Sequence, residues 1–308
     1  MKVLVTGGAG FIGSHTVEGL LEIGASVRIL DNLSTGKRTN LPPHKNLDLQ
    51  VGDIRNPNDV AMAMQDITHV MHLAAQVSVQ ASVDDPPTSC AQNILGFVNV
   101  LHAARRQQVK RVVYASSAAV YGVPETVPLS ESAGLNPISP YGLEKFVNEQ
   151  YATLFQSLYG FSSLGLRYFN VFGPRQDPKS PYAGVISKFI ERINEKQPLT
   201  VFGDGLQTRD FIFVKDIARA NRAALEVEEA EVCNVGTGQS WTLLQVIDAL
   251  ATCVQKTLSV NHLPERGGDI RHSTAQVSRI QQSLGFRPQT SLETGLKELL
   301  RYLCAVKA

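Results

Sequence analysis

The 308-residue sequence has little of several features that mark large classes of protein. Its four cysteines, Cys90, Cys233, Cys253 and Cys304, lie far apart and form no C-x-x-C pair, so we expect reduced thiols and no metal site. No run of 18 apolar residues is present, and a membrane-spanning helix is therefore not expected. The apolar stretch at 3–5 is too short for a signal peptide, which favours a cytoplasmic protein.

Charge of one sign is also scarce, because 29 Lys and Arg residues are balanced by 28 Asp and Glu residues. With so small a net charge the chain has no basic field that would hold nucleic acid or an anionic membrane. An anionic substrate would have to be bound by a few individually placed cations. The 43% of hydrophobic residues are enough to bury a core in one or two domains.

Short apolar runs alternate with helical patterns along the first half of the chain. This rhythm is typical of a parallel sheet that is covered by helices on both faces. The predicted strands are 3–5, 27–30, 47–51, 70–73 and 111–115, and the predicted helices begin near Ile12 and cover 57–65 and 88–107.

The second half is less regular and is predicted to divide between this sheet and a smaller lobe. Helices are expected in the lobe, and loops rich in Pro and Gly on its substrate side. The further strands of the same sheet are predicted at 164–167, 210–214 and 232–235, the loops at 173–184 and 264–268, and the helices near 242–254 and 291–303.

Four glycines, Gly7, Gly8, Gly10 and Gly13, lie between the first predicted strand and the first predicted helix. They fit G-x-G-x-x-G or its variant G-x-x-G-x-x-G, in which glycines allow a tight turn, close approach to a pyrophosphate and packing of helix on strand. Asp31 ends the second strand 18 residues after Gly13. A carboxylate there accepts hydrogen bonds from the adenosine ribose and repels a 2′-phosphate, so the pattern predicts NAD rather than NADP.

Further cofactor contacts are expected where the next strands end. Asp53 follows the third strand and can reach the adenine amino group, or it can cap a turn. Small residues at 73–76 end the fourth strand, as is needed where backbone passes close to a cofactor.

Tyr141 and Lys145 stand at i and i+4, one helical turn apart on the same face. A free tyrosine titrates near about pH 10, and a neighbouring ammonium together with a positively charged nicotinamide favours the tyrosinate and brings that pKa toward the working pH. Ser116 and Ser117 end the preceding strand, where a hydroxyl can bind the same substrate oxygen and relay its proton. The pattern predicts a proton-transfer site beside the dinucleotide.

Seven short motifs run through the chain: TGGAGFIG at 6–13, GDI at 52–54, HLAA at 72–75, YASSAAVYG at 114–122, SPYGLEK at 139–145, LRYFNVFGPRQ at 166–176 and RDFIFVKDIA at 209–218. Together they resemble those of the NAD-dependent epimerase/dehydratase family of extended short-chain dehydrogenases/reductases. The resemblance implies an α/β fold, a Rossmann-type doubly wound parallel sheet with a smaller α/β C-terminal substrate lobe. It implies an NAD-binding domain at 1–168 with returning segments at about 209–238, and a substrate lobe mainly at 169–308.

The same resemblance implies a role for each residue of the proton-transfer site. Ser117 is the catalytic serine, and Ser116 lies beside the cofactor. Tyr141 is the acid and base, and Lys145 holds the nicotinamide ribose and tunes Tyr141. The full set implied to bind NAD is Gly7, Gly10, Phe11, Ile12, Gly13, Asp31, Asn32, Ser34, Thr35, Gly36, Asp53, Ile54, Leu73, Ala74, Ala75, Gln76, Ser116, Tyr141, Lys145 and Tyr168.

Two alanines bear on the reaction. Family dehydratases carry Asp-Glu directly after the serine or threonine, and Ala118 and Ala119 stand there in this chain. Elimination of water then lacks its acid and base. The resemblance instead implies a UDP-hexose 4-epimerase, in which Tyr141 takes the proton of the sugar 4-hydroxyl while hydride passes from C4 to NAD. The 4-keto sugar turns over, and the hydride returns to its other face.

The resemblance also assigns residues to the UDP-sugar. Asn170, Arg209 and Arg266 correspond to positions that bind the diphosphate, for which a guanidinium fork is well suited. Phe202 corresponds to the uracil position and Asp269 to one that binds a ribose hydroxyl. The full set implied to bind the substrate is Ser117, Tyr141, Asn170, Val185, Phe202, Arg209, Arg266, Asp269 and Ser273.

Ser273 stands four residues after Asp269, at the position that gates the hexose pocket in the epimerases this chain resembles. A small residue admits N-acetyl groups, so UDP-GlcNAc and UDP-GalNAc are expected beside UDP-glucose and UDP-galactose. The alternative is an inert small loop residue. Val77 departs from one epimerase subtype, which has a lysine near the sugar phosphates there; this argues against that subtype and leaves the chemistry intact.

Two other functions stay open. A UDP-glucuronate 4-epimerase or decarboxylase would need a cation or hydroxyl cluster at the sugar carboxylate, and the sequence identifies none. An NAD-sensing regulatory protein would have no use for the proton-transfer residues. The family also implies a homodimer through helices around 89–107 and 141–159. The apolar positions that would serve this interface, or the core, are Phe146, Tyr151, Leu154, Phe155 and Leu158.

Overall fold

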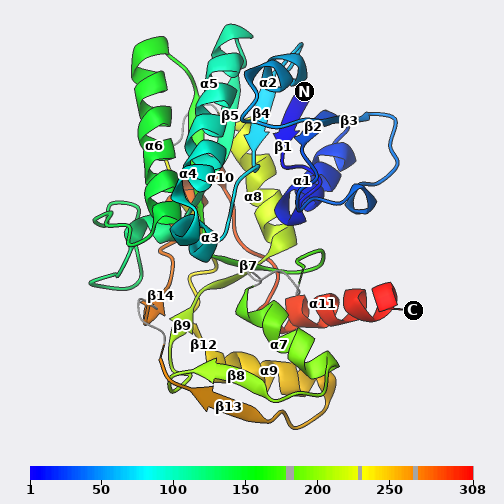
Figure 1. Cartoon of the computed structure of the whole chain (residues 1–308), viewed down its shortest axis with the longest axis vertical. Helices are drawn as coiled ribbons and strands as arrows, with labels where there is room; N and C mark the ends of the chain where they lie inside the picture. The colour runs from blue at the N-terminus through cyan, green and yellow to red at the C-terminus, as the bar shows by residue number, and fades with distance from the viewer. Residues whose placement is uncertain (178–183, 228–230, 266–269, 308) are drawn as a thin grey trace.

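A computed structural model describes residues 1–177, 184–227, 231–265 and 270–307. Within them the central sheet has seven strands in the order β11-β6-β5-β4-β1-β2-β3, and neighbouring strands are parallel (Figure 1). The predicted doubly wound α/β fold is confirmed. The strands are β1 (Lys2–Thr6), β2 (Ser26–Asp31), β3 (Leu47–Val51), β4 (His69–His72), β5 (Arg111–Ser117), β6 (Ser163–Tyr168) and β11 (Cys233–Val235).

One strand prediction is wrong. The apolar run at 210–214 was expected in the central sheet, but β10 (Phe211–Phe213) pairs with β7 (Asn170–Phe172) in a separate two-stranded sheet. Both edges of β6 are already paired, one with β5 and the other with β11. Phe169 turns the chain out of the central sheet while its N–H still donates to the carbonyl oxygen of Val235 at 3.0 Å. The following residues therefore form a new edge for β10.

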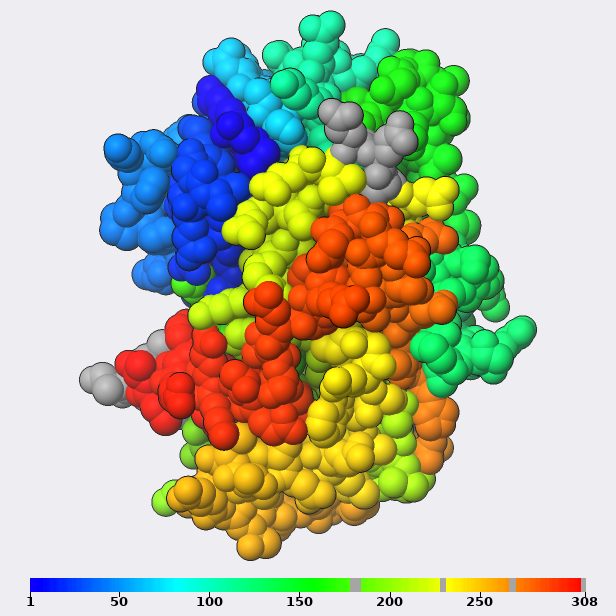
Figure 2. Space-filling model, turned by 180° about the vertical axis from the view of Figure 1, so that it is seen from behind, coloured from blue at the N-terminus to red at the C-terminus, as the bar shows by residue number. Residues whose placement is uncertain are grey.

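Alternation along the buried strands gives the sheet two apolar faces. Val3 and Val5 pack with α1, α8 and α10, whereas Leu4 packs with α2, α5 and α6. Figure 2 shows the first of these faces, where α8 lies between α1 and α10. The helices are α1 (Phe11–Glu22), α2 (Pro57–Ala63), α3 (Val79–Asp84), α4 (Pro86–Cys90), α5 (Gly96–Arg106), α6 (Pro140–Tyr159), α8 (Val214–Glu226) and α10 (Ser278–Leu284), with a π-helical turn η2 (Ala91–Leu95) and 3-10 turns η1 (Arg38–Asn40) and η3 (Ala118–Tyr121).

The smaller lobe lies below the central sheet in the view of Figure 1 and has its own apolar core. Phe189, Val201, Phe211, Val246 and Leu296 belong to this core. Its elements are α7 (Val185–Asn194), β8 (Leu199–Phe202), β9 (Thr208–Arg209), β12 (Trp241–Thr242), α9 (Leu243–Val254), β13 (Val260–Leu263), β14 (His272–Ser273) and α11 (Leu292–Lys307).

Both helices expected near 242–254 and 291–303 are present. Among the described residues, no helix combines the length and the apolar character that crossing a bilayer requires.

A buried ion pair ties α6 to the sheet. Glu149 on α6 accepts hydrogen bonds from the guanidinium of Arg167 on β6, at 2.9 and 2.7 Å, and both side chains are 4% exposed. Ser116 Oγ on β5 donates to the same carboxylate at 2.5 Å. Arg167 also donates to the hydroxyl of Tyr121, which in turn donates to Asn234 on β11. The pair therefore fixes α6 against three adjacent strands.

Replacing Arg167→Met should leave Glu149 charged and unpaired in the interior, and should lower the free energy of unfolding by about 3–5 kcal/mol. Urea unfolding followed by circular dichroism measures this. The double variant Arg167→Met with Glu149→Gln removes both charges and should recover part of the loss. A loss below about 1 kcal/mol in the single variant, as for an exposed pair, would contradict this role.

Candidate active site

The glycine-rich turn between β1 and α1 leaves no room for side chains. Gly7 has a positive φ of 70°, and a Cβ there would lie 2.7 Å from the backbone nitrogen of Ala74. A Cβ on Gly13 would lie 2.1 Å from the carbonyl oxygen of Gly7. Gly10 is the N-cap of α1, and no side chain of the described residues forms a capping hydrogen bond at this end of the helix. The first N–H groups of α1 can therefore bind an anion such as a pyrophosphate.

Asp31 holds this turn as well as facing it. Its carboxylate accepts the N–H of Ala9 at 2.9 Å and that of Leu33 at 2.8 Å, and the residue is 7% exposed. A Cβ on Gly36 would lie 2.9 Å from either carboxylate oxygen. Asp31, the predicted ribose-binding residue, thus joins the glycine turn to the segment up to Gly36, which holds further predicted cofactor residues.

Asp53 takes part in the turn interaction that the sequence left as an alternative. The backbone N–H and the guanidinium of Arg55 both donate to its carboxylate, and so does the side-chain amide of Asn32. Arg55 holds the pKa of Asp53 well below its usual range. The contact of Asp53 with adenine stays a prediction.

Two residues that were not predicted from the sequence, Ser89 and Asn93, join the loop after β4 to α6. Asn93, in the π-helical turn, accepts the N–H of Gln76 at 2.8 Å and donates to the carbonyl oxygen of Gln76 at 2.9 Å. Asn93 also donates to Glu144 on α6 at 2.6 Å, and Ser89 donates to the same oxygen at 2.8 Å. The signal that could have found Ser89 and Asn93 is their place in the helix predicted at 88–107, because a polar side chain that lies on the buried face of a helix needs a hydrogen-bond partner.

The three predicted catalytic residues come together where β5 ends and α6 begins. Ser139 caps α6 by accepting the N–H of Gly142 at 3.1 Å, which starts the helix directly before Tyr141. Tyr141 forms a side-chain hydrogen bond with Ser117 at the end of β5. Lys145 Nζ donates to the carbonyl oxygen of Ala115 at 3.0 Å and lies 5.8 Å from the centre of the Tyr141 ring.

Burial has the largest effect on the pKa values of Tyr141 and Lys145. It raises the pKa of Tyr141 above its ordinary value, against the lowering effect of the hydrogen bond with Ser117, and Glu144 raises it further. Burial lowers the pKa of Lys145 to about 8, although Glu144 acts in the opposite direction. The expectation that the pKa of Tyr141 is lowered is therefore not met by the chain's own groups. The positive charge of an oxidised nicotinamide would have to supply the shift.

Two hydroxyl groups that the family resemblance assigns to the cofactor, those of Ser116 and Tyr168, form hydrogen bonds with side chains of the protein itself. Ser116 donates to Glu149, as described above, and Tyr168 donates to Asn221 on α8 at 2.6 Å. Asn221 in turn donates to Thr16 on α1 at 2.9 Å. Contact of Ser116 and Tyr168 with the cofactor stays a prediction.

Apart from Ser117 and Tyr141, the predicted substrate residues that the structure describes lie in the smaller lobe or in the sheet of β7 and β10. Asn170 is on β7 and Arg209 on β9, and Ser273 on β14 pairs with Arg209 in a parallel register. Phe202 ends β8, and Val185 begins α7. The predictions for Arg266 and Asp269 lie outside the described residues.

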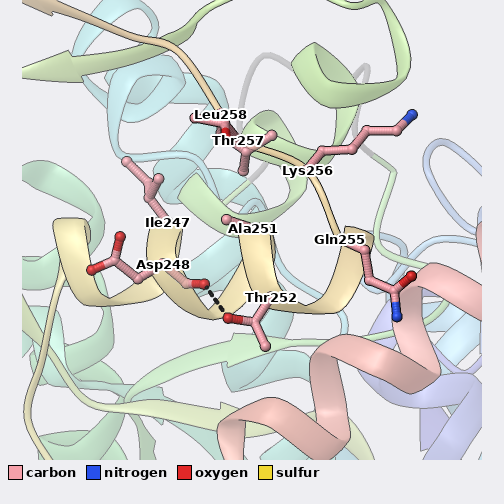
Figure 3. A pocket seen from close by; sticks show the side chains of 8 residues that line it. All are labelled: Ile247, Asp248, Ala251, Thr252, Gln255, Lys256, Thr257 and Leu258. Atoms are coloured by element: carbon pink, nitrogen blue, oxygen red, sulfur yellow. Dashed lines mark hydrogen bonds between the residues drawn. The ribbon is translucent and has the colours of Figure 1, made fainter.

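A separate surface pocket lies far along the smaller lobe, on α9 and the turn after it (Figure 3). In the described chain its lining contains none of the predicted site residues, so it is not the site of this chemistry. The lining residues are Ile247, Asp248, Ala251, Thr252, Gln255, Lys256, Thr257 and Leu258.

The chain is similar to known proteins over nearly its whole length. The model of the NAD dependent epimerase/dehydratase family matches residues 3–236. UDP-N-acetylglucosamine 4-epimerase from Methanobrevibacter ruminantium M1, solved with UDP-N-acetylmuramic acid, is 40% identical, with a TM-score of 0.96 over 99% of this chain and 98% of that one. UDP-glucose 4-epimerase from Thermotoga maritima, solved with UDP-glucose, is 38% identical, with a TM-score of 0.95 over 100% of both chains. UDP-glucuronate 4-epimerase of Thermodesulfobacterium geofontis is 32% identical over 97% of this chain and 95% of that protein.

The chain belongs to the NAD dependent epimerase/dehydratase family. It is an NAD-dependent epimerase. Its residues fit the cofactor, because the glycine turn excludes Cβ atoms, the first turn of α1 presents N–H groups, and Asp31 stands where a 2′-phosphate would be repelled.

Replacing Gly13→Ala should push the turn away from α1 and weaken NAD binding by at least about tenfold, a loss of about 1.4 kcal/mol or more. The NAD content of the purified protein and titration of the stripped protein with NAD measure this. Gly19→Ala is the matched control on the same helix, because a Cβ there meets nothing within 4 Å. Equal NAD affinity in the two variants would show that the close packing at Gly13 does not matter for the cofactor.

Proposed function

We propose that the protein is a UDP-hexose 4-epimerase that interconverts UDP-glucose with UDP-galactose and UDP-GlcNAc with UDP-GalNAc through a 4-keto intermediate. The observation that carries the proposal is the hydrogen-bonded pair of Ser117 and Tyr141, with Lys145 one turn further along α6. The pair lies at the carboxyl edge of the parallel sheet. That edge is where ligands of open α/β sheets bind, and the glycine turn after β1 shares it.

The protein's part in the reaction is proton transfer and positioning. The phenol of Tyr141 exchanges a proton with the sugar 4-hydroxyl, and Ser117 holds the same oxygen by a hydrogen bond. Lys145, held by the carbonyl oxygen of Ala115, keeps a cation close to the phenol when it is protonated. NAD supplies the hydride acceptor and donor, so that no external reductant is consumed.

Epimerisation fits better than elimination of water. Ala118 and Ala119 follow Ser117 in the turn η3, where family dehydratases carry their carboxylates. The alanine side chains offer no carboxylate, and Ser117 Oγ accepts the backbone N–H of Ala119 at 3.1 Å. The second candidate, action on UDP-glucuronate, is kept because relatives of this chain are named as UDP-glucuronate 4-epimerases.

We also propose which part of the chain binds each ligand, and that the protein is a homodimer. Residues 1–168, with returning segments at about 209–238, bind NAD, and 169–308 mainly bind the UDP-sugar. Two copies associate through α5 and α6, where Leu154 and Leu158 are 49% and 60% exposed. The other apolar candidates, Phe146, Tyr151 and Phe155, pack against core clusters of their own chain. The enzyme works in the cytoplasm.

Replacing Tyr141→Phe should lower kcat by about 10²–10⁴-fold, because the group that exchanges the proton is lost. The assay incubates the NAD-loaded protein with UDP-glucose, UDP-GlcNAc and UDP-glucuronate in parallel and identifies the product sugars. Tyr151→Phe, on the same helix, is the control that should retain activity. Turnover of UDP-glucuronate alone would replace the proposed substrates. Full activity of Tyr141→Phe would refute the mechanism.

Replacing Ser273→Tyr should reduce kcat/KM for UDP-GlcNAc by at least about tenfold, because the bulkier ring takes space that an acetamido group needs. The rate with UDP-glucose should change by less than about threefold. Ser273 is 7% exposed, and Ser273→Ala keeps the position small as a control. An equal loss on both sugars in the Tyr variant would show that this residue is no gate.

A further inference from the structure

Asp210 is a buried carboxylate that the proposed chemistry does not use. It is 0% exposed and stands between Arg209 and β10. One of its oxygens accepts the N–H of Thr237 at 2.8 Å and the hydroxyl of Thr237 at 2.6 Å. The other accepts the N–H of Gly238 at 2.9 Å and the N–H of Ala275 at 3.1 Å. Asp210 therefore joins two loops that are distant in the sequence.

These contacts connect three of the residues assigned to the substrate, Asn170, Arg209 and Ser273. Asn170 donates both its N–H and its side-chain amide to the carbonyl oxygen of Asp210, at 3.0 and 3.3 Å. Arg209 is the preceding residue in the chain. Ser273 lies two residues before Ala275, and it is paired with Arg209 in the sheet. A shift of Asp210 would thus move all three substrate residues.

The surroundings of Asp210 are built for an ionised carboxylate. Burial raises its pKa, while the donors from Thr237, Ala275 and Gly238 oppose that shift. A Cβ on Gly236 would lie 2.7 Å from a carboxylate oxygen, so the turn at 236–238 wraps closely around it. An amide at this position would turn its own N–H₂ group toward two of the donors.

We propose that Asp210 is a positioning residue for the substrate, which holds Asn170, Arg209 and Ser273 at one fixed spacing for the UDP-sugar. The proposal rests on the proposed function, since those three residues are assigned to a UDP-sugar there. Asp210 itself touches neither the sugar nor the diphosphate in this account. Its loss should weaken substrate binding and leave proton transfer at Tyr141 intact.

A second buried aspartate on the same stretch of chain provides a matched control. Asp216 on α8 is 1% exposed and accepts the N–H groups of Gln289 and Thr290 at 3.0–3.3 Å, as well as the guanidinium of Arg219 at 2.7 Å. It is a loop clamp of the same kind. Its partners among the described residues lie before α11 and on α8, and none of them is a residue assigned to the substrate.

The test compares Asp210→Asn with Asp216→Asn in the NAD-loaded protein, using calorimetric titration with UDP, thermal unfolding and steady-state kinetics. Asp210→Asn should raise the Kd for UDP and the KM for UDP-glucose by about tenfold, and should change kcat by less than about threefold. Asp216→Asn should lower the Tm and change the Kd for UDP by less than about twofold.

An equal loss of UDP affinity in both variants would overturn the proposal, because a general loss of stability would then explain it. An unchanged Kd in Asp210→Asn would overturn it too. If Asp210→Asn does not fold, Thr237→Val removes the hydroxyl bond to Asp210, together with the bond that this hydroxyl accepts from the N–H of Gln239. It should raise the Kd by about threefold, and Thr237→Ser should restore it. Equal affinity in the two Thr237 variants counts against the proposal. Failure of the wild-type protein to bind UDP would instead remove the proposed function on which the inference rests.

Discussion

In the proposed mechanism the active site depends on one constraint, which is that the buried phenol of Tyr141 has to give up and recover a proton. Burial raises the pKa of Tyr141, and the neighbouring carboxylate of Glu144 raises it further. The hydrogen bond with Ser117 acts in the opposite direction, and Lys145, the cation beside the ring, has a pKa that burial lowers to about 8. The protein therefore holds Tyr141 neutral by itself. The proposed mechanism therefore couples proton transfer to the cofactor, because the positive charge of a bound, oxidised nicotinamide would shift the balance toward the phenolate.

The scaffold serves this constraint by fixing the catalytic helix on the sheet. Lys145 is held by a backbone carbonyl of β5, and one turn later Glu149 is held by Ser116 on the same strand and by Arg167 on β6. On the other side, Glu144 is joined to the loop after β4 through Asn93. Helix α6 thus meets the sheet at two points, through Lys145 and Glu149, and Glu144 joins it to the loop after β4. Such an arrangement gives a reacting tyrosine little freedom, which favours catalysis by positioning.

Much of the fold and the catalytic trio could be predicted from the sequence, because both are written in short local patterns. The glycine turn, the alternating strands and the i, i+4 pair of Tyr141 and Lys145 need no knowledge of distant contacts. The strand at 210–214 was misplaced because apolar composition does not say which strand edge is free. Glu149 and Asp210 were missed for a related reason. Their partners are 18 to 65 residues away, and only the fold brings them together.

The most direct test of the central claim is the titration of Tyr141, followed by the ultraviolet absorbance of the phenolate as the difference between the wild-type protein and Tyr141→Phe. In protein stripped of NAD the pKa of Tyr141 should lie above about 10, the value of free tyrosine. Binding of NAD should lower that pKa, and binding of NADH should lower it less. A pKa below about 10 without cofactor, or the same pKa with and without NAD, would contradict the account.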